Sequence, residues 1–86
     1  MSESHGDRLK RLTMRSMRRG IKEMDLILSA YAASNLAQMD SAGLDRYDAL
    51  LEENDQDLYQ WVTGQVAAPN VFADLIRDIS QTFQKQ

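Results

Sequence analysis

The residues best suited to polar chemistry lie where a basic opening segment meets an acidic remainder. Residues 1–22 contain seven lysines and arginines against two carboxylates, whereas residues 23–86 contain three against eleven. At the junction, Arg19, Gly20 and Glu23 place a guanidinium, a residue without a side chain and a carboxylate within about one helical turn. Because glycine lets another backbone approach closely, this spacing predicts a polar docking edge for a partner.

The same junction also has a purely local interpretation. Gly20 can be the glycine with positive φ that follows the end of one helix, and Glu23 can reach back to cap the free N–H groups at the start of the next. Both interpretations place a helix boundary here.

Few residues could perform catalysis or bind a metal. The chain has no cysteine, and its one histidine, His5, lies in an N-terminal segment that is expected to fray. Asp45, Asp48 and Glu52 are expected to form a solvated helix face, since a linear face offers few converging ligands to a hard cation. The four glycines are not clustered as in a phosphate-binding loop. We therefore predict no enzymatic activity, no metal site and no stably bound cofactor.

The arginines of the first helix form a stripe that permits three interpretations. At 100° per residue one face carries Arg8, Arg11, Arg15, Arg18 and Arg19. Such a stripe can contact nucleic-acid phosphates, lie on a membrane surface, or pair with acidic helices of the same chain. Internal pairing is favoured, because the remainder of the chain is acidic and the apolar face opposite the stripe is thin.

Helical periodicity recurs along the chain, and no segment alternates apolar and polar residues as a strand does. We predict an all-α fold, a small five-helix bundle forming a single domain over residues 1–86, with residues 1–6 and 84–86 frayed. The predicted helices span residues 7–19, 21–36, 41–53, 55–63 and 70–83. Asp40 and Asn70 are predicted N-caps, and Gly64 is predicted to end the fourth helix.

Large side chains on these helices are assigned to the core or the surface by the same periodicity. Trp61 is predicted to lie in the core beside Leu58 and Val62. Met17 and Met24 are expected to fill the core, whereas Met14 is expected to be exposed.

Signals for membranes and export are missing from the sequence given. Its longest apolar stretch falls far short of the ~20 residues that cross a bilayer. The N-terminus lacks a secretory apolar segment, so we expect a bacterial cytoplasmic location and no membrane insertion.

The junction resembles a known motif. Arg19-Gly20-Ile21-Lys22-Glu23 is similar to the RGxxE motif of the SdhE-type flavinylation factors, and residues 15–25 resemble that family's longer pattern, RS-x-RRG and then E-x-D. Residues 50–52 and 55–61 resemble the family's LLE followed by DPDL-aromatic-x-W. The resemblance covers about residues 8–80. Departures occur at Gln56 in place of a proline, Met24 in place of a leucine, and Gly43 in place of an acidic residue.

The resemblance implies an assembly factor that binds the flavoprotein subunit of succinate dehydrogenase, or of fumarate reductase in some bacteria. Such a factor promotes covalent attachment of FAD to a histidine of that subunit, so FAD is acted on through the partner. Arg19, Gly20 and Glu23 are then the expected partner-binding residues. Further rim contacts are expected from Arg15, Arg18 and Asp25. We expect a monomer that binds no nucleic acid, with a small antitoxin-like or nucleic-acid-binding regulator as the alternative.

Overall fold

The regular elements of the protein are helices throughout residues 3–84, the part of the chain that this computed structural model describes. The five α-helices are α1 (His5–Arg15), α2 (Lys22–Asn35), α3 (Ser41–Leu50), α4 (Asp55–Val62) and α5 (Asn70–Gln84), and a short 3-10 helix, η1 (Leu36–Gln38), follows α2. The predicted all-α five-helix bundle is confirmed. No helix within these residues is both long and apolar enough to span a bilayer.

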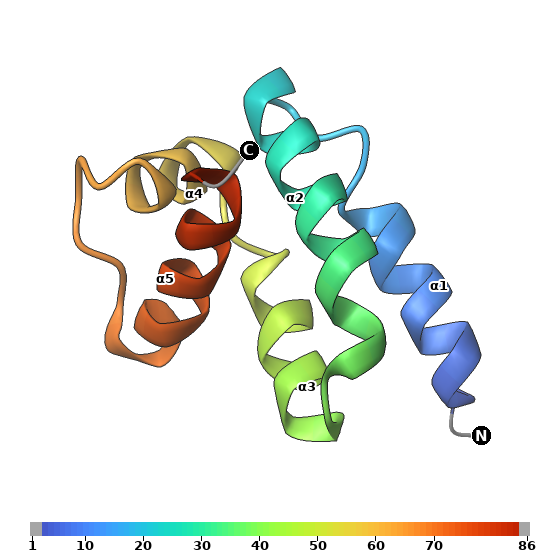
Figure 1. The fold of residues 1–86 in the computed structure, drawn as a ribbon. Coiled ribbons are helices and arrows are strands. Elements are labelled where there is room, and N and C mark those ends of the chain that lie inside the picture. Colours follow the sequence, from blue (N-terminus) through green and yellow to red (C-terminus); the bar gives the residue numbers. More distant parts are fainter. Residues whose placement is uncertain (1–2, 85–86) are drawn as a thin grey trace.

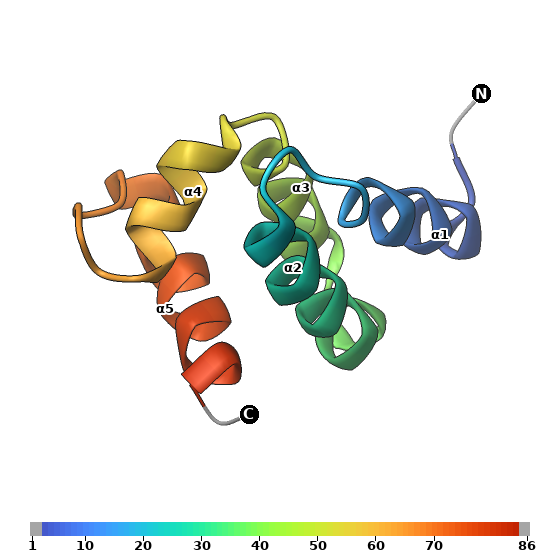
Figure 2. The ribbon, with the colours of Figure 1, turned by 90° about the horizontal axis from the view of Figure 1, so that it is seen from above.

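Helix α2 lies at the centre of the arrangement. Figure 2 shows α1 at one end of the molecule and α4 with α5 at the other, with α2 and α3 between them. Helix α2 contacts α1, α4 and α5, as can be followed in Figure 1. Its central place follows from its sequence, because apolar residues occur nearly all the way round it. It buries Met24, Ile27, Leu28, Tyr31 and Ala32.

The other helices each turn one apolar stripe toward the common core. Burial of such stripes is the main favourable contribution to folding, at roughly 25 cal/mol per Å² of apolar surface. The buried apolar side chains outside α2 are Leu12, Leu36, Leu44, Tyr47, Leu50, Leu51, Leu58, Val62, Phe72, Leu75, Ile76 and Ile79.

Local capping signals fix several helix ends. Asp40 is the N-cap of α3, as predicted, and its carboxylate accepts a hydrogen bond from the Gly43 N–H at 2.8 Å. Helix α4 ends at Val62, and Gly64 follows it with a positive φ of 83°. Gly64 was predicted to end this helix. Asn70 is the first residue of α5 rather than its cap, because the Phe72 N–H already donates to the carbonyl of Pro69.

The first helix is shorter than predicted. It ends at Arg15, and Ser16 is its C-cap, with backbone angles that are still helical (φ −77°, ψ −13°). The Ser16 hydroxyl bonds both the Leu12 carbonyl (2.8 Å) and the Tyr47 hydroxyl (2.6 Å). Between α1 and α2 the residue with positive φ is Arg18, at 56°, and not Gly20 as predicted. Because the helix itself stops at Arg15, Met17 does not continue its apolar face; it is 44% exposed, and its assignment to the core was wrong.

Two further side-chain predictions are confirmed, and one needs correction. Met24 is fully buried and Met14 is exposed. Trp61 lies at the edge of the core rather than inside it, half-buried and stacked on Phe72 with ring centroids 6.2 Å apart. Of the ends expected to fray, residues 1–2 and 85–86 lie outside the described residues, while His5 and Gly6 belong to α1 and Gln84 ends α5.

Candidate functional site

One carboxylate from α4 fixes the junction between α1 and α2. Asp55 Oδ1 accepts a hydrogen bond from Arg19 Nε at 2.8 Å and lies 2.7 Å from Arg19 Nη2, while Oδ2 accepts from the Gly20 N–H at 2.5 Å. Arg19 also donates to the carbonyls of Arg15 (3.1 Å) and Leu51 (3.3 Å). The side chains of Arg19 and Asp55 are only 12% and 15% exposed. We call Arg19, Gly20 and Asp55 the junction clamp.

Gly20 permits a close approach, but the group that approaches is part of the same chain. A Cβ at this position would lie 3.2 Å from Asp55 Oδ2, tighter than most contacts of a side-chain carbon. The glycine therefore serves the internal hydrogen bond to Asp55. Gly20 is nonetheless exposed to solvent.

Asp25 holds the other side of the junction. Its Oδ2 accepts from the Arg18 N–H at 2.8 Å, and its Oδ1 accepts from the Ser29 hydroxyl at 3.2 Å. The first bond stabilises the left-handed turn at Arg18, a conformation that is unfavourable for a residue with a Cβ. Asp25 thus positions the turn through hydrogen bonds within the chain, while the Arg18 side chain is exposed.

Glu23 points outward from the first turn of α2. The prediction that it caps this helix was wrong, because Ile21 occupies the N-cap position and no side chain caps the helix there. Within residues 3–84 the Glu23 side chain makes no hydrogen bond or ion pair, and it is exposed. Of the three central motif residues, it alone presents a free charged group to solvent.

The arginine stripe pairs with the acidic face of α3 and with the N-terminal segment, which confirms the internal-pairing interpretation for α1. Arg11 lies 3.1 Å from Asp48 and 2.9 Å from Glu3, and Arg15 lies 2.5 Å from Asp48. Hydrogen bonds from Arg11 lower the pKa of the Asp48 carboxyl below its usual value. The remaining pairs of the stripe are Arg8 with Asp45 and Arg15 with Glu52.

Two buried tyrosines form polar contacts that the sequence did not reveal. Burial raises the pKa of Tyr47, which bonds Ser16, to about 12. The Tyr31 hydroxyl donates to Asp78 at 2.6 Å, and burial raises its pKa also. Both are long-range contacts, 31 and 47 residues apart, so no local pattern could have found them.

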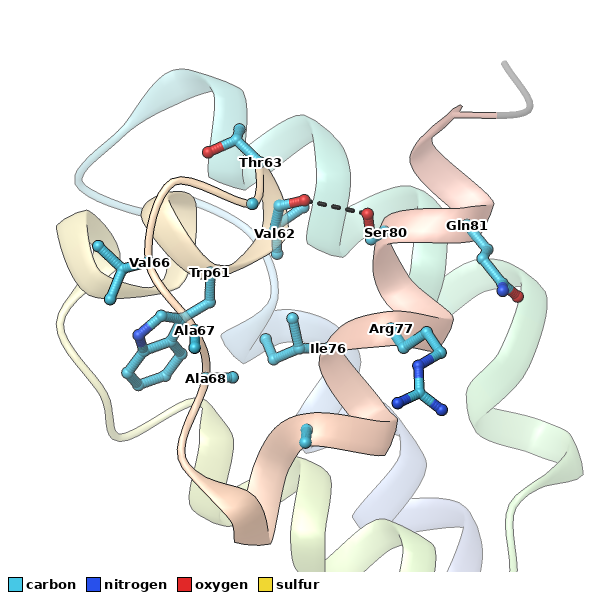
Figure 3. Close-up of a pocket in the computed structure, with 12 residues that line it drawn as sticks. Trp61, Val62, Thr63, Val66, Ala67, Ala68, Ile76, Arg77, Ser80 and Gln81 are labelled. Carbon is cyan, nitrogen blue, oxygen red and sulfur yellow. Dashed lines mark hydrogen bonds between the residues drawn. The ribbon is translucent and has the colours of Figure 1, made fainter.

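A wide hollow of the surface lies away from the motif. It has a volume of about 600 Å³ and lies between the end of α4, the following loop and α5. Figure 3 shows Trp61 on one side of it and Arg77 on the other, with the Ser80 hydroxyl donating to the Val62 carbonyl at 3.0 Å. No predicted site residue lines this hollow. In the described part of the chain no group of three His, Asp or Glu side chains could hold a metal ion.

The described chain thus presents a fixed junction with one free carboxylate on a small helical bundle. The model of the family described as "Flavinator of succinate dehydrogenase" matches residues 10–83, and the chain belongs to this family. The resemblance found in the sequence is thereby confirmed.

Relatives of the chain carry a consistent name. A protein of Candida glabrata named "Succinate dehydrogenase assembly factor 2, mitochondrial" is 49% identical over 63 residues, which covers 73% of this chain and 41% of the relative. A Saccharomyces cerevisiae protein of the same name is 49% identical over 53 residues, covering 62% of this chain and 33% of the relative. The chain thus matches less than half the length of these relatives.

The expected bacterial cytoplasmic location is contradicted by these relatives. They are fungal proteins, and their names place them in mitochondria.

Proposed function

We propose that this chain is an assembly factor that binds the flavoprotein subunit of succinate dehydrogenase and promotes covalent attachment of FAD to that subunit. Its membership of the flavinator family over residues 10–83 carries the proposal. The names of its relatives, succinate dehydrogenase assembly factor 2, support it further. The homologous subunit of fumarate reductase is a second partner of the same class, and the free factor is a monomer.

The motif residues contribute to this function in two ways. Glu23 meets the partner directly, because its carboxylate is exposed and has no partner within the described chain. Arg19 acts through Asp55, since its guanidinium is turned into the junction clamp. Gly20 keeps the surface between them open to close approach.

The rim residues are engaged to different degrees. Arg15 pairs with Asp48, and Asp25 stabilises the turn at Arg18. Both residues therefore support the docking surface through contacts within the chain. The exposed Arg18 side chain is the one rim group placed to add a contact of its own.

The chemistry belongs to the partner. Covalent flavinylation needs a histidine held against the flavin C8-methyl group and stabilisation of negative charge on the flavin, which are tasks of orientation and electrostatics. The histidine and the FAD are both on the flavoprotein subunit. The factor stabilises the productive arrangement of that subunit, without acting as a nucleophile, and is therefore not an enzyme.

The alternative, a nucleic-acid-binding regulator, has no specific observation in its favour. Phosphate binding would use the charges of the α1 stripe. Arg8, Arg11 and Arg15 already pair with carboxylates of the same chain.

The test compares two exposed carboxylates, each in the first turn of its helix. Glu23→Ala and the matched control Asp7→Ala should each cost only about 0.3–1 kcal/mol of folding free energy. Each variant is produced with the flavoprotein subunit in cells that lack their own factor, and covalent flavin is measured by its fluorescence after denaturing electrophoresis. We expect Glu23→Ala to leave the subunit without covalent FAD, and Asp7→Ala to behave as wild type.

Two results would overturn parts of the proposal. Normal flavinylation with folded Glu23→Ala would remove Glu23 from the site. If the wild-type chain gives no more covalent flavin than cells without any factor, the assembly function itself is wrong.

A further inference from the structure

A small apolar hollow lies directly beside Glu23. It has a volume of about 160 Å³ and is lined by Glu23, Leu26, Ile27, Tyr59 and Phe83. Leu26 is 64% exposed and Phe83 is 43% exposed. Large apolar side chains that gather in an exposed patch mark an interaction surface more often than scattered ones do.

Three helices build this hollow. Glu23, Leu26 and Ile27 follow one another at i, i+3 and i+4, so they share one face of α2. Tyr59 comes from α4, and Phe83 comes from the last turn of α5. Because all three helices pack into the same core, the walls of the hollow are held in place without the partner.

The hollow continues the surface of the junction clamp. Tyr59 follows Asp55 by one turn of α4, on the same face of that helix. A second hollow, of about 380 Å³, is lined by the clamp residues Arg19, Gly20 and Asp55. The two hollows therefore flank the first turn of α2, with Glu23 on the rim of the apolar one.

We propose that the apolar hollow receives one leucine-, methionine- or phenylalanine-sized side chain of the flavoprotein subunit, and that a lysine or arginine of the same partner segment pairs with Glu23. This inference rests on the proposed function. The size argument is that an apolar cavity of about 150 Å³ holds a benzene-sized group. The charge argument is that Glu23 is an unpaired carboxylate on the rim, which attracts a cation and rejects an acidic segment.

The proposal assigns partner contacts to two side chains outside the motif, Leu26 and Phe83. Leu26→Ser and Phe83→Ser each remove an apolar wall of the hollow. Val71→Ser is the matched control for Leu26→Ser, because Val71 lies on α5 and is also 64% exposed. Leu26 and Val71 are mostly exposed, Phe83 is partly exposed, and none of the three belongs to the buried core. Their loss therefore leaves the core intact, and unfolding curves of the variants verify this.

Binding is measured by calorimetric titration of each variant with the purified flavoprotein subunit at two salt concentrations. We expect Leu26→Ser and Phe83→Ser to raise Kd about tenfold or more, as for truncation of a buried anchor, and Val71→Ser to change it by less than about twofold. Glu23→Gln should flatten the salt dependence of Kd, whereas Leu26→Ser should leave that dependence unchanged.

The outcomes separate this inference from the proposed function. If Leu26→Ser and Phe83→Ser bind as tightly as wild type while Glu23→Ala binds weakly, the inference is wrong and the proposed function stands. If Leu26→Ser abolishes only self-association, seen by sedimentation, the hollow binds a second copy of the chain and the inference is again wrong. If the wild-type chain does not bind the subunit, the proposed function fails and this inference with it.

Discussion

Removal of Asp55 is expected to destabilise the protein far more than removal of an ordinary surface carboxylate. Asp55→Ala deletes the acceptor for Arg19 and for the Gly20 N–H. It leaves the Arg19 side chain, which is 12% exposed, with only two backbone carbonyls as acceptors. Breaking one side of a buried ion pair costs about 3–5 kcal/mol, and the slight exposure of this pair lowers our expectation to about 2–4 kcal/mol. This is a large part of the roughly 4–13 kcal/mol that a protein of this size has in total.

A double-mutant cycle isolates the contact between Arg19 and Asp55. Arg19→Ala, Asp55→Ala and the double variant are unfolded in urea and followed by far-ultraviolet circular dichroism. Because the two side chains are in direct contact, we expect a coupling free energy of about 1–3 kcal/mol. Asp57→Ala is the matched control, since Asp57 lies in the same first turn of α4 and is exposed.

Two results would refute this reasoning. Equal urea midpoints for Asp55→Ala and Asp57→Ala would mean that the junction clamp contributes nothing to stability. A coupling free energy near zero would mean that Arg19 and Asp55 act independently, and that the guanidinium of Arg19 is available to a partner after all.

Three further predictions concern the rest of the fold. The lowered pKa of Asp48 stabilises the folded protein above about pH 3.8, the usual pKa of this group, and this stabilisation is lost as the pH falls through the lower pKa of the folded protein. Asp48→Asn is therefore expected to make the free energy of unfolding fall less steeply with acid. An unchanged dependence on acid pH would contradict this. Trp61→Ala is expected to cost about 1–3 kcal/mol in urea unfolding, less than the loss of a fully buried ring; a cost above that range would place the ring in the core. Tyr47→Phe is expected to cost about 0.5–1.5 kcal/mol, because Ser16 keeps its bond to the Leu12 carbonyl; an unchanged urea midpoint would show that the buried hydroxyl pair adds no stability.

The fold was predictable from the sequence where its signals are local. The apolar stripe of α5 consists of Phe72, Leu75, Ile76 and Ile79, at a spacing that only a helix brings to one face. The N-cap Asp40 likewise acts on a backbone N–H three residues away. Periodicity and capping depend on such short-range geometry, so the number and order of the helices followed from them.

The junction was not predictable in the same way. Helical periodicity continues through residue 19, yet α1 ends at Arg15, and the residue that follows makes a contact distant in sequence: Ser16 bonds Tyr47, 31 residues along the chain. The partner of Gly20 is Asp55, 35 residues away. The sequence therefore indicated a close approach at Gly20 but did not identify the group that approaches. The assignment of Met17 to the core failed for the same reason.

The break between α1 and α2 also separates the chemical roles of two motif residues. In one continuous helix Arg19 and Glu23, four residues apart, would lie on the same face and would attract each other. The structure ends α1 before Arg19, which turns the guanidinium toward Asp55 and leaves the Glu23 carboxylate alone in solvent. Loss of Arg19 should therefore weaken partner binding together with folding stability, and loss of Glu23 should weaken binding alone. A motif that is contiguous in sequence thus contains one residue that sets the geometry of the surface and another that meets the partner.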